Sequence, residues 1–147
     1  MRVLVVSEDV TERLRASSAL LLQPDTEVVE AVSAEAFRDL IIGQGERFDV
    51  LVVDGDLQPR GGFATLYDLR ARAELQGTEP IAALVLISRE QDRWLASWAG
   101  ANDVIAKPVN AFDLARRVAA LEHAEAAPYG DAGSDAAQLA EAVRDHR

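Results

Sequence analysis

The sequence predicts an α/β fold, a doubly wound parallel sheet with helices on both faces, and two observations predict it. Short apolar runs rich in β-branched residues, such as 2–6 and 48–53, alternate with longer stretches of helical periodicity. These runs are apolar on both faces, which is typical of strands buried inside a parallel sheet. Strict alternation implies crossover connections, and a chain of 147 residues suits one such domain.

The first strand and helix come from the apolar run 2–6 and the helical pattern over 10–23. Three leucines of that helix are expected to face the core: Leu14, Leu21 and Leu22. The run 26–31 is more polar and predicts a second strand nearer an edge of the sheet. Ser33 caps a helix expected over 33–42, which nearby glycines end.

The run 48–53 predicts a buried third strand that leads into Asp54, and a loop over 55–62 follows it. The alternation then continues, with helices expected over 63–75, 91–99 and 111–123 and strands expected over 81–88 and 103–106. For five parallel strands of this kind the flavodoxin-like (βα)5 order 2-1-3-4-5 is the natural choice, and it places the first and third strands side by side.

The composition changes after residue 123. Residues 124–147 hold eight alanines together with proline and glycine, which indicates a linker followed by a weak helix over 135–145. We therefore expect one domain over 1–123 and an Ala-rich linker with a weak C-terminal helix over 124–147.

Composition excludes several classes of function. The chain has no cysteine, so it forms no disulfide, thiolate nucleophile or zinc–cysteine site. Its two histidines, His123 and His146, are too few for a multi-histidine metal site. A net charge of −10 argues against binding to nucleic acid or to an anionic membrane. The N-terminal apolar run is too short for a signal peptide or a membrane span, and we expect a cytoplasmic protein.

Polar side chains follow four of the predicted strands, at the edge where ligands bind in sheets of this kind. They are Glu8, Asp9, Asp54, Asp56, Ser88 and Lys107. Lys107 is the one lysine beside fourteen arginines, which suggests a position where a compact ammonium is needed. Clustered carboxylates require a cation, and Mg²⁺ prefers oxygen ligands. A carboxylate beside Mg²⁺, a hydroxyl and an ammonium is the set that phosphoryl transfer onto a carboxylate requires.

These motifs resemble the receiver domain of two-component response regulators, of the chemotaxis-regulator type, over about residues 1–123. RVLVVSEDVTERLR is similar to the family's first strand, acidic pair and first helix, and FDVLVVDGDLQPRGG is similar to its phosphoacceptor strand and loop. Gly62 follows Asp54 by eight residues, as in the family. LVLIS ends at the family's hydroxyl position, and GANDVIAKP resembles its lysine–proline signature.

The resemblance implies a role for each matching residue. Asp54 would accept a phosphoryl group from a histidine kinase or a phosphotransfer protein. Glu8, Asp54 and the backbone carbonyl of Asp56 would hold Mg²⁺. Ser88 would donate a hydrogen bond to one phosphoryl oxygen, and Lys107 would pair with another.

Several positions depart from the family pattern and indicate an atypical active site. Ser7 stands where the family has a carboxylate, so weak Mg²⁺ binding is expected. Asp9 is the alternative ligand if the first strand ends one residue later. Arg89 follows Ser88 where a small residue is usual, and it would either crowd the phosphoryl pocket or add a cation. Val104 replaces the aromatic residue of the family's usual switch.

Three functions compete. The first is a single-domain receiver, not a metabolic enzyme, that signals through a downstream protein target. The second is a pseudo-receiver that binds proteins without phosphorylation. The third is a small enzyme on the same fold, which ranks last because no glycine-rich phosphate loop follows the first strand. Trp94 and Trp98 share a helix face; either they cover the core or Trp98 anchors a partner or a homodimer through the helix 91–99, the strand 103–106 and the helix 111–123.

Overall fold

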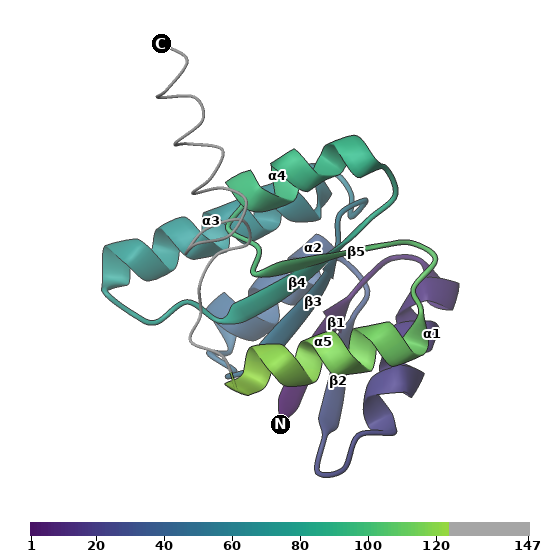
Figure 1. Ribbon diagram of the computed structural model, residues 1–147. Coiled ribbons are helices and arrows are strands. Elements are labelled where there is room, and N and C mark those ends of the chain that lie inside the picture. Colours follow the sequence, from purple (N-terminus) through teal and green to yellow (C-terminus); the bar gives the residue numbers. More distant parts are fainter. Residues whose placement is uncertain (124–147) are drawn as a thin grey trace, which may run out of the picture.

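The computed structural model describes residues 1–123 as a single sheet of five parallel strands with helices on both sides (Figure 1). The strands are β1 (Arg2–Val6), β2 (Glu27–Ala31), β3 (Val50–Asp54), β4 (Ala82–Ile87) and β5 (Asp103–Ala106). Their order is β2-β1-β3-β4-β5, which confirms the predicted topology. In the register, Val3 pairs with both Val28 and Val50, so β1 and β3 are neighbours as expected. The weak helix expected over 135–145 lies outside the described residues.

The sheet separates two layers of the core, and helices cover each of them. The helices are α1 (Val10–Leu21), α2 (Ala34–Arg38), α3 (Gly61–Gln76), α4 (Arg93–Trp98) and α5 (Ala111–His123). Helices α1 and α5 cover one face of the sheet, where Leu20 and Leu114 are fully buried against the odd-numbered side chains of β1. Helices α2, α3 and α4 cover the other face around Phe37 and Leu66. The central strands β1, β3 and β4 are buried on both faces, which explains why their sequences are almost continuously apolar.

The prediction for the inner face of α1 is wrong. Leu14, Leu21 and Leu22 are exposed by 53%, 59% and 85%, whereas the buried positions are Glu12, Ala16, Ser17, Ala19 and Leu20. Ala16, Ala19 and Leu20 face the sheet and α5, and Leu14, Leu21 and Leu22 lie on the opposite side of the helix. Helix α1 therefore presents an apolar stripe to solvent, and Val10 extends it at 57% exposure.

One other helix differs from expectation, whereas the short helix expected over 91–99 is present. The helix expected over 33–42 is α-helical only through Arg38 and continues as a π-helical turn, Asp39–Gly43. A short 3₁₀ turn, Glu90–Asp92, leads into α4, which is trimmed to six residues. Neither tryptophan of α4 is buried: Trp94 is 69% exposed, and Trp98 is 49% exposed and stacks on Tyr67 of α3 at 4.3 Å between ring centroids. The interpretation that both tryptophans cover the core is therefore wrong.

Arg70 of α3 fastens the amino ends of β4 and β5. Its guanidinium donates hydrogen bonds to the backbone carbonyls of Ile81 and Gly100 and to the Asn102 side chain at 2.9 Å. Asn102 accepts a second bond, from the backbone N–H of Ala83 at 2.8 Å. Burial lowers the pKa of Arg70 to about 10, because desolvation disfavours its charged form.

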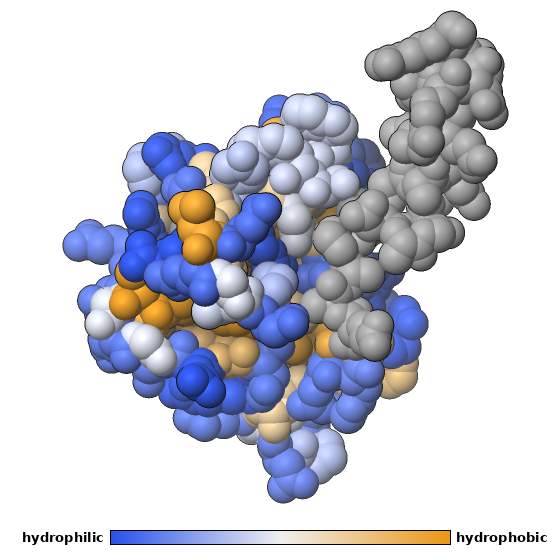
Figure 2. Space-filling model, turned by 90° about the vertical axis from the view of Figure 1, so that its left-hand side faces the viewer, coloured by the Kyte–Doolittle hydropathy of each residue, from blue (hydrophilic) through white to orange (hydrophobic). Residues whose placement is uncertain are grey.

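A pocket of about 190 Å³ lies at the same end of the sheet, between the π-helical turn and α3. Its walls include apolar side chains of both elements, such as Ile41 and Leu69, together with Arg70. Figure 2 views this side of the molecule and shows apolar surface among hydrophilic residues. Pro80 and Ile81, just before the amino end of β4, also line the pocket. It is therefore separate from the polar residues at the carboxyl ends of the strands.

Candidate functional site

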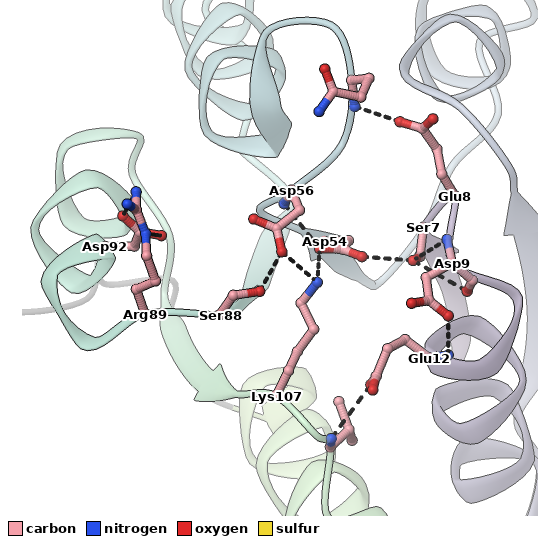
Figure 3. A network of polar contacts seen from close by, with 12 residues as sticks. Ser7, Glu8, Asp9, Glu12, Asp54, Asp56, Ser88, Arg89, Asp92 and Lys107 are labelled. Atoms are coloured by element: carbon pink, nitrogen blue, oxygen red, sulfur yellow. Dashed lines mark hydrogen bonds and ion pairs between the residues drawn. The ribbon is translucent and has the colours of Figure 1, made fainter.

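The carboxyl ends of β1, β3, β4 and β5 bring five polar residues together, four of the six predicted ones and Ser7 (Figure 3). Ser7 follows β1, Asp54 ends β3, Asp56 lies in the loop after it, Ser88 follows β4 and Lys107 follows β5. Parallel strands end at one edge of the sheet, which is why residues up to a hundred positions apart meet there.

Both oxygens of the Asp54 carboxylate are hydrogen-bonded, and the residue is 3% exposed. Lys107 Nζ lies 2.6 Å from Oδ1, which also accepts the backbone N–H of Asp56 at 2.9 Å. The Ser7 hydroxyl donates to Oδ2 at 2.7 Å and is itself completely buried. The Asp54 carboxylate thus accepts from one ammonium and two neutral donors, so both of its oxygens are satisfied despite their burial.

Lys107 bridges two carboxylates. Its Nζ lies 2.8 Å from Asp56 Oδ2 in addition to its contact with Asp54. Burial alone would lower the pKa of Lys107, but its hydrogen bonds to Asp54 and Asp56 outweigh burial and raise that pKa. The hydrogen bond from Lys107, followed by that from Ser88, lowers the pKa of Asp56. Lys107 and Asp56 are therefore both charged at neutral pH.

Glu8 and Asp9 do not join this cluster. The Glu8 carboxylate points away from Asp54 and accepts the backbone N–H of Gln58. Asp9 caps α1 by accepting the backbone N–H of Glu12 at 3.1 Å. Among residues 1–123, no three acidic or histidine side chains are grouped closely enough to hold a metal ion. The Mg²⁺ ligand set stays a prediction.

The two remaining departures from the family pattern take definite positions. Arg89 pairs with Asp92 at 3.0 Å at the start of α4, so it is turned away from the Asp54 carboxylate in Figure 3. Val104 is 1% exposed and packs in the core beneath α4. A buried aliphatic side chain at this position cannot move between a buried and an exposed state as an aromatic switch does.

Sequence reasoning missed two side-chain contacts in and beside this site. The Asp56 side chain was assigned no role, yet it accepts hydrogen bonds from both Ser88 and Lys107. Glu12, which is 8% exposed, accepts the backbone N–H of Val109 at 3.4 Å and so ties α1 to the loop after Lys107. The contact of Asp56 could have been predicted, because an acidic residue two positions after Asp54 lies within reach of the same cations. The contact of Glu12 could not, because Glu12 resembles any charged residue in the first turn of a helix.

Comparisons with known proteins agree with this architecture. The family model of the response regulator receiver domain matches residues 3–119. An uncharacterized response regulatory protein of Mycobacterium tuberculosis is 36% identical over 130 residues, which cover 86% of this chain and 94% of that protein. No helix within the described residues is long and apolar enough to cross a bilayer.

Solved structures share the fold. The chemotaxis response regulator CheY4 of Vibrio cholerae superposes with a TM-score of 0.67 at 23% identity, over 82% of this chain and 97% of that one. The response regulator domain of Thermotoga maritima CheB gives a TM-score of 0.68 at 22% identity, over 85% and 98%. With the family model and the mycobacterial relative, these findings identify the chain as a signalling module rather than a metabolic enzyme: it belongs to the response regulator receiver domain family.

Proposed function

We propose that this receiver accepts a phosphoryl group on Asp54 from a histidine kinase or a phosphotransfer protein in the cytoplasm and signals through contacts with a downstream protein. The observation that carries the proposal is the position of Asp54. Asp54 is the last residue of β3, and the Lys107 ammonium lies 2.6 Å from one oxygen of its carboxylate. Ser88 follows the adjacent strand, β4. Carboxylate nucleophile, cation and hydroxyl are the groups that transfer onto oxygen requires.

The proposed reaction is an in-line displacement at phosphorus. A carboxylate oxygen of Asp54 forms a bond to phosphorus as the bond from phosphorus to the donor's imidazole nitrogen breaks, and the electron pair stays on that nitrogen. Lys107 and Ser88 would then interact with the equatorial oxygens, where negative charge is concentrated. The Ser7 hydroxyl donates to Asp54 Oδ2, so it orients the carboxylate but also competes for one of its lone pairs.

Receiver domains typically bind Mg²⁺, and in this chain Asp54, the Asp56 carbonyl and Glu8 are the residues we propose for it. All are oxygen donors of the kind that a hard cation prefers, and Glu8 is exposed, so its side chain can turn toward the rim by giving up its hydrogen bond from Gln58. When bound, the ion would neutralise charge on the phosphoryl oxygens.

The phosphodonor protein requires a docking surface beside Asp54. The apolar stripe of α1, with Val10 and Leu14 exposed by 57% and 53%, begins next to the site, and Phe112 at the start of α5 is 82% exposed. Exposed apolar residues grouped beside a polar site are typical of a protein-binding surface. We propose this surface for the phosphodonor, and the exposed Trp98 on α4 for the downstream partner or a second subunit.

The test is exposure of the purified protein to a small acyl-phosphate donor with Mg²⁺, followed by measurement of its intact mass. The wild-type protein is expected to gain one phosphoryl group, and Asp54→Asn is expected to gain none, since an amide cannot attack phosphorus. Asp56→Asn, which keeps Asp54, is the matched control and should remain labelled. Absence of label in every protein would favour the pseudo-receiver, for which the buried Ser7 hydroxyl on Asp54 is the supporting observation.

Ser7→Asp restores the carboxylate that the family usually carries. In the absence of Mg²⁺ it should lower the free energy of unfolding by about 1–3 kcal/mol, because it buries a second negative charge beside Asp54. Mg²⁺ should bind Ser7→Asp more tightly than wild type and so restore its free energy of unfolding. It should also speed phosphorylation of Asp54 in this variant. Thermal unfolding with and without Mg²⁺ measures the effect.

Ser18→Asp is the control, since Ser18 lies on the exposed side of α1 and gains the same charge away from the site. Equal Mg²⁺ affinities of wild type and Ser7→Asp would contradict the prediction and indicate that Asp9 or another group already supplies the ligand.

A further inference from the structure

The Asp56 carboxylate is bonded to the two side chains that a phosphoryl group on Asp54 would need. The Ser88 hydroxyl and Lys107 Nζ both contact Asp56 Oδ2, the latter at 2.8 Å. The same Nζ is 2.6 Å from Asp54 Oδ1, so the lysine lies between the two carboxylates (Figure 3). Hydroxyl and ammonium come from separate strand ends, after β4 and β5, and they converge on this one oxygen.

We propose that the Asp56 side chain is an intramolecular competitor of the phosphoryl group: in the unphosphorylated protein it occupies Ser88 and Lys107, and it must leave them when Asp54 is phosphorylated. The proposal rests on the function proposed above and adds a residue that controls the rate of that reaction. No bond to Asp56 is made or broken; its carboxylate exchanges two hydrogen bonds for water.

Three observations make this exchange practicable. The Asp56 side chain is 52% exposed, so it can turn into solvent without opening the core. The neighbouring Leu57 is 1% exposed and anchors the loop. The backbone N–H of Asp56 donates to Asp54 Oδ1 at 2.9 Å, so the backbone keeps its position after the side chain has left.

The negative charge of Asp56 strengthens its hold on Lys107. Hydrogen bonds from Lys107 and Ser88 lower the pKa of Asp56, so its carboxylate is an anion at neutral pH. An anion that accepts a charge-assisted bond from Lys107 resembles, in charge and donor set, the phosphoryl oxygens that would replace it. Asp56→Asn retains the shape of the side chain but loses the charge, so it isolates this effect.

The first measurement is the rate at which Asp54 is phosphorylated by a small acyl-phosphate donor with Mg²⁺, followed by intact mass. Asp56→Asn is expected to react about 5- to 30-fold faster than wild type, because a neutral amide oxygen holds Ser88 and Lys107 less strongly than a carboxylate does. Asp68→Asn is the matched control: it removes one negative charge from the middle of α3, where Asp68 pairs with Arg60 at 2.9 Å, and should react at the wild-type rate.

The second measurement observes Lys107 directly. Lys107 is the one lysine of the chain, so protein grown with ¹³C-labelled lysine gives a single set of side-chain signals. Asp56→Asn should shift the ε-carbon signal in the unphosphorylated protein, and Asp68→Asn should not. After phosphorylation, the wild-type and Asp56→Asn signals should coincide, since Asp56 has then left Lys107 in both.

The outcomes separate this inference from the proposed function. Labelling of wild type and Asp56→Asn at the same rate, or slower labelling of the variant, would overturn the inference and leave the function standing. An equal acceleration in Asp68→Asn would also overturn it, because the effect would be one of general charge. Failure of every variant to accept a phosphoryl group would overturn the proposed function and the inference with it.

Discussion

Lys107→Arg is expected to slow phosphorylation of Asp54 by about 100-fold while leaving the protein folded. The lysine side chain is 13% exposed, and its Nζ lies 2.6 Å from Asp54 and 2.8 Å from Asp56. An ammonium is a compact charge that fits between two carboxylates, whereas a guanidinium is planar and several atoms wide. Arginine retains the positive charge at this position but displaces it from the phosphoryl oxygens.

The measurement is the rate of mass gain with an acyl-phosphate donor, together with a thermal unfolding curve to show that the fold is retained. Arg89→Lys is the matched control, because it makes the opposite exchange at a residue that pairs with Asp92 rather than with Asp54. A Lys107→Arg variant that reacts as fast as wild type would mean that positive charge alone suffices at this position.

Gly62→Ala is expected to destabilise the protein by about 3 kcal/mol or more. A Cβ atom on Gly62 would lie 2.2 Å from the backbone oxygen of Asp54 and 2.9 Å from a methyl carbon of Val53. Backbone cannot yield as a flexible side chain can, so α3 and the end of β3 would have to separate. The separation would also displace the Asp54 carboxylate, and the variant should lose its phosphorylation.

Urea unfolding measures the loss, and Gly45→Ala is the comparison. Gly45 has a φ of +65° but no atom within 4 Å of the added methyl group, so only backbone strain of about 1–2 kcal/mol applies there. If Gly62→Ala costs no more than Gly45→Ala, the close approach of α3 to β3 is not a constraint on this fold.

The alternation of apolar runs and helical patterns was sufficient to predict the sheet order and the edge at which Asp54, Ser88 and Lys107 meet. A parallel sheet has one carboxyl edge, so a residue that ends a buried strand is placed there whatever the packing details. No comparable rule predicts where the side chains of the loop after β3 point. The direction of the Asp56 side chain depends on hydrogen bonds that close the loop, such as Gly62 N–H to the Gly55 carbonyl at 3.0 Å.

The inner face of α1 shows a different limit. Periodicity weighted by side-chain size selects Leu14 and Leu21, whereas close packing against the sheet and α5 selects Ala16 and Ala19. Sequence periodicity identifies the helix, but the distance between helix and sheet determines which stripe is buried, and that distance is a property of the assembled fold.

The Arg70 network also has a consequence for cooperativity. One side chain in α3 joins Ile81, Gly100 and Asn102, so segments 11 to 32 residues further along the chain are fastened to a helix that precedes them. The edge strand β5 therefore cannot fray from its amino end without releasing the arginine and exposing the carbonyls it satisfies. In amide hydrogen exchange, α3 and the amino end of β5 would then open as a single unit, with protection closer to that of a central strand than of a free edge.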